Sequence, residues 1–431
     1  MLAVVVAVGL IVVGAWWLDT PAGSLGTLGD QLTGAGRITG LVGTYLAVVE
    51  VTLMARLPWL DRAIGTDRLA LWHRRLGEYT VTLLSAHAVL IVLGYARNDR
   101  ISVLAETRAV VLHYPDVLMA TVGLGMLIAI GVMSARWIRA RLRYETWYFV
   151  HLYTYLALVL SFAHQLATGD DFATHIATRW LWCAMFVVVA AVVLVWRVGM
   201  PLRSSFRHRL WVTKVVREGP RHVSVYVTGH HLDELVADAG QHFRWRFLTR
   251  GEWWQSHPYS LSAVPDGEHL RITVKHLGDH SANLRELRPG TRVLAEGPYG
   301  ALTELRRRRH KVLLIAGGIG ITPLRALFEA LPARPGDLTL LYRASHKRDL
   351  VLSHELEDIA ASKGASVKYS VGPRTMRPDP FAPKTLTRTV SELRDHDVFV
   401  CGPPGMTEAA LRGLRGAGVP RSQIHTEDFA L

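Results

Sequence analysis

The chain has 431 residues, half of them apolar, and a formal net charge of +13. Its length allows two or three domains. Its two cysteines lie far apart in the sequence, which excludes a disulfide framework and a cysteine-based zinc or iron–sulfur site.

Apolar residues are concentrated before about residue 200, and the rest of the chain has the composition of an ordinary α/β protein. Six apolar runs approach the ~20 residues that a helix needs to cross a bilayer. The first run lacks the basic start and the clear cleavage site of a signal peptide, so we expect a retained helix there. The six expected spans are 2–18, 38–55, 76–95, 117–134, 147–166 and 180–197.

Arginines are unevenly distributed over the loops between these runs. They are abundant after the second, fourth and sixth runs and scarcer in the other loops. Because cytoplasmic loops are rich in Lys and Arg, we expect an integral plasma or inner membrane protein with both termini and the second half in the cytoplasm. Inner-face arginines and sites for anionic cofactors account for the positive charge, so nucleic acid binding is not required.

Two of the runs each carry a pair of histidines. His73 and His87, at the third run, are fourteen residues apart, which on a helix is a rise of about 21 Å and a return to nearly the same face. The fifth run carries His151 and His164 and points the same way, so depth pairs His73 with His151 near the cytoplasmic side and His87 with His164 near the outer side. Two stacked bis-histidine sites suit two b-type haems.

Alternatives to this interpretation stay open. The histidines could be ordinary polar residues that hydrogen-bond between helices. Zinc is a poorer choice, because two histidines with no nearby carboxylate or cysteine make a poor zinc set. The thirteen-residue spacing of His151 and His164 does not return to one helix face, so either this helix is irregular or the two haems are reached from different sides.

Alternating strand patterns separated by turns fill the region from about 205 to 300. Within it, HPYSLSAVP at 257–265 resembles the flavin motif of the ferredoxin–NADP reductase superfamily, in the form found in the NADPH oxidase and ferric reductase family. The resemblance implies that Tyr259 packs on the isoalloxazine, that Ser260 hydrogen-bonds near N5, and that His257, followed by Pro258, lies near the ribityl or pyrophosphate part.

Further segments resemble the same family. ITVKHLGDHSANL resembles its second flavin segment, which implies that Lys275, Ser281 and Asn283 lie around a helix start that can receive phosphate. EGPYG at 296–300 resembles the strand and turn that end the flavin barrel. RRRRH at 306–310 follows, which we expect to be a solvated loop; contact with anionic lipid headgroups is the alternative.

KVLLIAGGIGITPLRALFEAL reads as a buried strand, a glycine loop and a helix with a proline in its first turn. Such a loop lets the backbone approach a pyrophosphate at the helix N-terminus. The sequence has no GxxxxGK[ST], which argues against nucleotide hydrolysis. The residues expected to hold the dinucleotide here are Gly317, Gly318, Gly320, Thr322 and Pro323.

By family position, Arg343 and Ser345 are candidates to hold an adenosine 2′-phosphate, which favours NADPH over NADH; a loop salt bridge is the alternative for Arg343. Phe429 resembles the terminal aromatic residue that covers the flavin, and two residues follow it. The segment VFVCGPPGM resembles the family's CGP motif, which places one thiol beside the nicotinamide C4. The residues of that motif are Cys401, Gly402 and Pro403.

The resemblance now covers nearly the whole chain. It implies a transmembrane flavocytochrome b with a six-helix all-α haem bundle at 1–200, an antiparallel β-barrel FAD domain at 205–303 and an α/β Rossmann-like NAD(P) domain at 309–431. NAD(P)H would deliver hydride to FAD, and single electrons would then pass to the inner and the outer haem.

The acceptor on the outer face stays open. Arg37 falls where the oxidases keep an arginine beside the outer haem, and a propionate or developing superoxide could pair with it; snorkelling to the interface is the alternative. Ile91 stands where the oxidases tend to have a polar histidine, which argues against oxygen. We therefore weigh O2, ferric chelates and an outer-face redox protein, besides a haem-free membrane anchor carrying a relic reductase.

Overall fold

The computed structural model describes residues 2–19, 24–169, 175–373 and 375–427. Phe429 therefore lies outside the described residues. The chain divides into two compact units. The first consists of Met1–Arg56 and Ala70–Arg197, and the second of Leu57–Leu69 and Val198–Leu431. The short segment between the second and third apolar runs thus packs with the second half of the chain.

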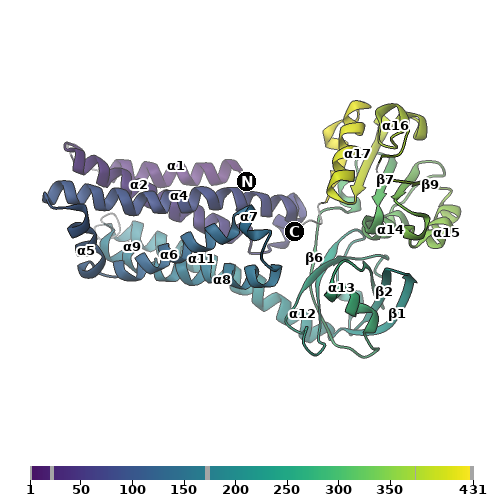
Figure 1. Ribbon diagram of the computed structural model, residues 1–431, viewed down its shortest axis with the longest axis horizontal. Coiled ribbons are helices and arrows are strands. Elements are labelled where there is room, and N and C mark those ends of the chain that lie inside the picture. The colour runs from purple at the N-terminus through teal and green to yellow at the C-terminus, as the bar shows by residue number, and fades with distance from the viewer. Residues whose placement is uncertain (1, 20–23, 170–174, 374, 428–431) are drawn as a thin grey trace. The chain divides into compact units, whose positions relative to one another are not determined.

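The first unit is helical (Figure 1). Among the described residues, five helices are long and apolar enough to cross a membrane, and they cover the second to sixth expected runs. The helix α1 covers the first. The helices of this unit are α1 (Leu2–Asp19), α2 (Leu28–Leu53), α4 (Thr66–Asp99), α5 (Val103–His113), α6 (Val117–Ser134), α7 (Arg136–Arg139), α8 (Tyr144–Leu160), α9 (Ala163–Thr168) and α11 (Ile176–Val193), and a π-helical turn, Leu194–Gly199, follows α11.

A row of small residues brings α2 against α4. A Cβ added to Gly36 would lie 2.9 Å from Ile91, one added to Gly40 would lie 2.6 Å from the ring of His87, and one added to Gly43 would lie 2.9 Å from Leu84. Each contact is closer than real Cβ atoms show, so a larger residue at any of the three positions would require the facing side chain to shift. Small residues allow membrane helices to approach this closely.

The fifth expected span is broken in the middle. The helix α8 ends at Leu160, a turn occupies Ser161 and Phe162, and α9 starts at Ala163. At the turn the amide of Phe162 binds the carbonyl of Val159, three residues back, at 3.1 Å. The regular helical phase is therefore lost between the two histidines of this span.

The first part of the second unit contains two three-stranded antiparallel sheets, ordered β1-β2-β5 and β4-β3-β6. Two isolated bridges, Trp211 with Arg292 and Leu261 with Ile272, join the sheets. Alternate residues of these strands fill one core, in which Trp245 is fully buried. The strands are β1 (Trp211–Gly219), β2 (His222–Thr228), β3 (His242–Phe247), β4 (His257–Ser260), β5 (Leu270–Lys275) and β6 (Val293–Tyr299), with the short helix α13 (Asp279–Asn283) after β5 and α12 (Met200–His208) before β1.

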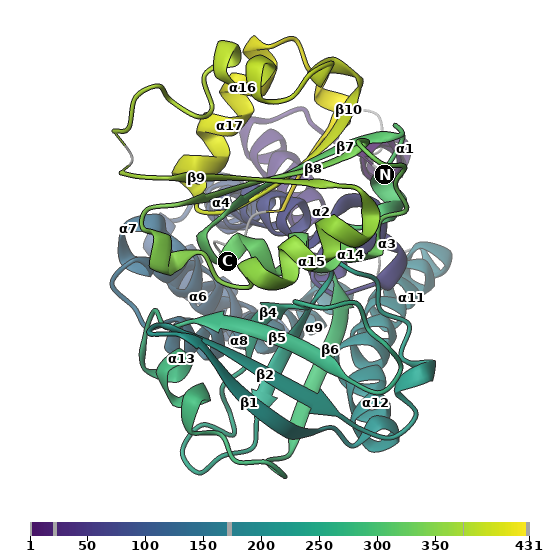
Figure 2. The same cartoon turned by 90° about the vertical axis from the view of Figure 1, so that its right-hand side faces the viewer.

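The second part of this unit is a five-stranded parallel sheet in the order β11-β10-β7-β8-β9. Figure 2 shows α16 and α17 on one side of it and α14 and α15 on the other. On β7, Leu313 and Ile315 join the first pair of helices, whereas Val312 and Leu314 join the second. The elements are β7 (Lys311–Gly317), α14 (Ile321–Ala330), β8 (Leu338–Ala344), α15 (Ser353–Lys363), β9 (Ser366–Val371), α16 (Pro383–Thr389), β10 (His396–Cys401), α17 (Pro404–Gly416) and β11 (Ile424–Thr426).

The linker arginines are more engaged than a solvated loop would be. Arg306 donates to the carbonyls of Arg62 and Ala63 at 3.3 and 3.0 Å, next to the short helix α3 (Pro58–Ile64). On the same helix, the buried Asp61 accepts a hydrogen bond from the amide of Gly300 at 3.3 Å. Burial raises the pKa of Asp61, and its hydrogen bonds oppose this only in part.

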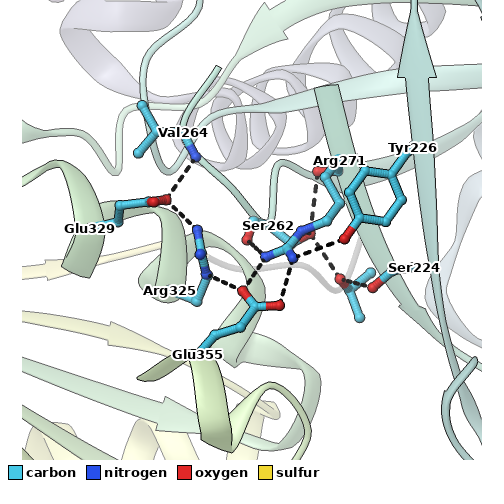
Figure 3. Close-up of polar contacts among 9 residues, drawn as sticks. Ser224, Tyr226, Ser262, Val264, Arg271, Arg325, Glu329 and Glu355 are labelled. Atoms are coloured by element: carbon cyan, nitrogen blue, oxygen red, sulfur yellow. Dashed lines mark hydrogen bonds and ion pairs between the residues drawn. The ribbon is translucent and has the colours of Figure 1, made fainter. Parts of the chain in front are cut away.

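A buried arginine joins the two parts of the second unit. Arg271, on β5, is 6% exposed, and its guanidinium donates to both carboxylate oxygens of Glu355 on α15 at 2.7 and 2.9 Å (Figure 3). It also donates to the hydroxyl and the carbonyl of Ser262 at 3.1 and 2.6 Å. Two residues 84 positions apart are thus held by a bidentate pair, which is the strong form of this interaction.

The cluster extends through a second arginine. Arg325, on α14, has its Nε 2.9 Å from Glu355 and also pairs with Glu329. Glu329 in turn accepts a hydrogen bond from the amide of Val264 at 3.3 Å. Burial opposes ionisation of Glu355, but Arg271 and Arg325 outweigh it and lower the pKa of this carboxyl.

We predict that Arg271→Met destabilises the second unit by roughly 2–3 kcal/mol, because it removes charged hydrogen bonds and leaves buried partners unsatisfied. For a unit of this size that is roughly 4–10 °C in Tm, measured by tryptophan fluorescence on the purified chain in detergent. The pKa of Glu355 is lower in the folded than in the unfolded chain. The extra stability of the wild type over Arg271→Met is therefore fully present above about pH 4.3, and it is lost as the pH falls through the pKa of folded Glu355.

The matched control is Arg412→Met, because the Arg412 side chain is 71% exposed and its nearest carboxylate is 3.8 Å away. A surface change of this kind stays within about 0.5 kcal/mol. Equal melting temperatures for the two variants would contradict the role given to Arg271.

Candidate electron-transfer sites

The structure brings the four membrane histidines together in two pairs. The ring centroids of His73 and His151 are 5.7 Å apart with perpendicular planes, and those of His87 and His164 are 6.4 Å apart. Two imidazoles that bind one metal ion from opposite sides, each through a nitrogen at about 2 Å, would place their ring centroids roughly 6 Å apart. Each pair therefore has the separation that a single iron between two rings requires, and the pairs are those that depth in the sequence predicts.

The break between α8 and α9 answers the question left by the thirteen-residue spacing. His151 lies on α8 and His164 on α9, with the turn at Ser161 and Phe162 between them. This turn changes the helical phase, so His164 still meets His87. Of the two possibilities that the sequence left open, the irregular helix is the one found.

At the outer pair, the His87 ring contacts the backbone of α2 through its Nδ1 atom. Its Nδ1 lies 2.8 Å from the carbonyl oxygen of Gly36, and Gly40 leaves the space that the ring occupies. A backbone carbonyl on Nδ1 fixes the proton there and leaves Nε2 free to bind a metal. The Nδ1 atom of His164 is buried without a hydrogen-bond partner among the described residues.

The inner pair has a different surrounding. Within the part of the chain that the structure describes, the buried Nδ1 atoms of His73 and His151 make no hydrogen bond, and Glu50 Oε2 lies 3.5 Å from Nδ1 of His73. The expectation that no carboxylate lies near these histidines was therefore wrong. Glu50 is an ionisable residue inside an apolar run, and such residues are usually functional, so the sequence did contain a signal.

Aromatic and basic side chains surround His151. Trp147 stacks on its ring with centroids 5.1 Å apart, and the guanidinium of Arg139 lies 4.6 Å from the centre of the Trp147 ring. Arg197, in the π-helical turn, donates to the carbonyl of Met54 at 3.1 Å and to the hydroxyl of Tyr148 at 3.0 Å. From the sequence alone, Arg197 was only one of the arginines that follow the sixth apolar run.

Arg37 lies on α2, directly after the glycine whose carbonyl faces His87, and it is half-buried. The neighbouring Ile91 packs against Gly36. The structure therefore places the candidate arginine on the helix that supports the outer pair, with an apolar residue beside it.

The HPYS motif forms β4, which pairs with β3. Trp245 donates from its indole to the carbonyl of Tyr259 at 3.0 Å, and burial raises the pKa of the Tyr259 phenol. The ring of His257 stacks on that of His280 with centroids 3.8 Å apart, while Ser260 is buried. Pro258, between them, is exposed. The motif thus places the stacked rings of His257 and Tyr259 on the edge strand of one sheet.

The second flavin segment ends β5 and continues into α13. Lys275 is the last residue of the strand, and Ser281 accepts hydrogen bonds from the amides of Leu277 and Gly278. Asn283 donates to Glu252 at 2.6 Å. The expected helix start is present, but the helix has only five residues, so its dipole is small.

The glycine loop and the CGP motif meet at one edge of the parallel sheet. A Cβ on Gly320 would lie 2.4 Å from the carbonyl oxygen of Cys401, and one on Gly317 would lie 2.2 Å from Met406. Because β7 and β10 are adjacent and parallel, their carboxyl ends lie together, where α/β sheets bind ligands. Cys401 is fully buried there. Gly318 at this edge has a left-handed conformation, and Thr322 donates a hydrogen bond to the carbonyl of Ile319. The remaining motif residues here are Pro323, Gly402 and the exposed Pro403.

Arg343 lies at the end of β8, but its guanidinium is bound to the chain itself. It donates to the carbonyls of Ser370, Gly372 and Pro373 at 3.0, 2.7 and 2.8 Å, and also to that of Ala344. It therefore fixes the segment after β9. Ser345 is exposed beside it.

Three family models match separate parts of the chain. The ferric reductase-like transmembrane component matches residues 39–162, the FAD-binding domain matches 220–303, and the oxidoreductase NAD-binding domain matches 314–412.

Individual relatives match part of the chain. The toluate 1,2-dioxygenase electron transfer component of Pseudomonas putida is 30% identical over 187 residues, 41% of this chain and 54% of that protein. A flavohemoprotein of Xylella fastidiosa is 28% identical over 203 residues, 44% of this chain and 50% of that protein. The solved FAD/NAD-binding domain of a Vibrio cholerae nitric oxide dioxygenase is 22% identical with a TM-score of 0.43, covering 51% of this chain and 98% of that domain.

The chain spans about half the length of the curated relatives it matches. The three family matches lie in the order in which the sequence motifs occur, with the membrane helices first and the two nucleotide-binding domains after them. The chain therefore combines a ferric-reductase-like transmembrane component with an FAD-binding domain and an oxidoreductase NAD-binding domain, an arrangement that matches the architecture of ferric reductases and NADPH oxidases.

Proposed function

We propose that this protein moves electrons across a membrane from cytoplasmic NAD(P)H, through FAD and two b-type haems, to an acceptor on the outer face. The observation that carries the proposal is the pairing of four histidines from two helical spans at ring separations of 5.7 and 6.4 Å. A hydrogen-bonding role alone would not require two such pairs, and the buried Nδ1 atoms of His73, His151 and His164 make no hydrogen bond to any described residue.

The residues fit two iron porphyrins as follows. His73 and His151 would hold one and His87 and His164 the other, and the iron would supply one-electron transfer between a two-electron flavin and the acceptor. Along α4 the two ligands differ by a rise of about 21 Å, which spans much of a ~30 Å hydrocarbon core. Arg197, near the inner pair, is suited to pair with a propionate.

The nucleotide end follows from the reductase motifs. Tyr259 and Ser260 would face the flavin ring, and the loop from Gly317 to Pro323 would receive the pyrophosphate of the dinucleotide. The meeting of this loop with Cys401 supports a nicotinamide site at that edge. Arg343 is committed to backbone carbonyls, so the preference for NADPH over NADH rests on Ser345. We propose that Phe429 covers the flavin.

The acceptor is proposed to be O2, giving superoxide, or a ferric chelate. Arg37 on α2 favours an anion or a developing negative charge near the outer pair. An outer-face redox protein is the alternative, in which case the chain would serve as an electron-transfer subunit. The arginine-rich loops support a cytoplasmic reductase.

Haem content tests the ligand pairs. We predict two b-type haems per chain in the wild type and one in His87→Leu, because the outer iron then lacks an axial ligand, as measured by pyridine haemochrome absorbance per flavin. His113→Leu serves as control, since His113 is exposed at the end of α5 and belongs to neither pair. Retention of both haems in His87→Leu would refute the pairing.

The acceptor is tested on the purified protein with NADPH by following superoxide and ferrous-chelate formation in parallel. We expect one of the two products, and a lower rate of its formation in Arg37→Ala, because the charge stabilising the outer acceptor is lost. If neither product forms while both haems become reduced, the outer-face redox protein is the acceptor instead.

A further inference from the structure

Each histidine pair has one member on α4, and these two histidines differ in the group that lies nearest to Nδ1. Behind His87 lies the neutral carbonyl of Gly36, at 2.8 Å from Nδ1. Behind His73 lies a carboxylate, with Glu50 Oε2 at 3.5 Å from Nδ1. Both partners come from α2, so one helix supplies a neutral acceptor to the outer ligand and an acidic one to the inner ligand.

The surrounding residues hold the Glu50 side chain in this position. It is 9% exposed, and Thr80 of α4 donates a hydrogen bond to its Oε1. Gly77 leaves room for the other oxygen, since a Cβ there would lie 3.3 Å from Oε2. A carboxyl group inside an apolar span is costly and persists where it has a partner and a function.

Metal binding would turn this contact into a hydrogen bond. An imidazole that binds a metal through Nε2 must carry its proton on Nδ1, and the buried Nδ1 of His73 makes no hydrogen bond of ordinary geometry within the described residues, with the carboxylate and the backbone of Glu50 as the acceptors near it. The present 3.5 Å is roughly 0.6–0.8 Å longer than a charge-assisted N–H···O bond.

A stronger acceptor on Nδ1 makes the imidazole a better electron donor, which favours the oxidised metal and lowers its reduction potential. We propose that Glu50 is a positioning residue that orients His73 and holds the inner haem at a lower potential than the outer haem. Electrons then run downhill from the inner to the outer site. This inference rests on the proposed function, since it requires the haems.

A positive charge at the same end acts in the opposite sense. Arg197 binds the carbonyl of Met54, four residues after Glu50, and the hydroxyl of Tyr148, three residues before His151. A test must therefore change Glu50 while leaving Arg197 in place.

The test is a spectroelectrochemical titration of the full chain with its haems bound. We expect Glu50→Gln to keep two haems and to raise the midpoint potential of the inner haem by at least 59 mV, a tenfold shift of the one-electron equilibrium between the haems. The outer haem stays unchanged. The haem retained in His87→Leu identifies the inner signal.

Glu78→Gln is the matched control, because Glu78 lies on the same turn of α4 as Gly77 but is exposed, and its potentials should equal those of wild type. Thr80→Val keeps the carboxylate but removes the hydrogen bond that orients it, and should give a smaller shift of the same sign together with a changed EPR signature of the inner haem. This second variant decides the question if Glu50→Gln does not fold.

Two failures can be told apart. If the wild type binds no pair of b-type haems, the proposed function is wrong. The other failure is a wild type that binds both haems while Glu50→Gln has the same inner-haem potential as Glu78→Gln. Thr80→Val replaces Glu50→Gln in this comparison if Glu50→Gln does not fold. In that case the role of Glu50 is wrong and the proposed function stands.

Discussion

The close approach of α2 to α4 is the constraint on which the membrane site depends. Three glycines of α2, at positions 36, 40 and 43, allow contacts that an added Cβ would disturb unless the facing side chains of α4 shifted. This approach places the Gly36 carbonyl behind His87 and makes space for its ring, and farther along the same helix it brings Glu50 to His73. The second span thus supports the two histidines of the third span.

The sequence predicted the histidine pairs because depth depends only on residue count along co-directional helices. It could not decide how His164 reaches His87, because an ideal helix carries that residue to another face and only the turn at Ser161 and Phe162 corrects it. Glu50 was missed because its contact joins two helices. No periodicity within one span reveals such a partner.

In the second half of the chain, the sequence predicted where the local motifs lie, but it did not predict the contacts between residues far apart in the chain. The glycine loop and Cys401 lie at the ends of adjacent parallel strands, as strand–loop–helix patterns indicate. Arg343 instead uses its donors on carbonyls after β9, and the pair of Arg271 with Glu355 joins residues 84 positions apart. Such pairings depend on how the two sheets pack, which a single sequence does not encode locally.

In the proposed path, electrons pass through the His73/His151 site before they reach the His87/His164 site. To test this order, NAD(P)H is mixed rapidly and anaerobically with the His73→Leu protein while flavin and haem absorbance are followed. We expect the flavin to be reduced at the wild-type rate while the remaining outer haem stays oxidised. Reduction of that haem as fast as in the wild type would contradict it.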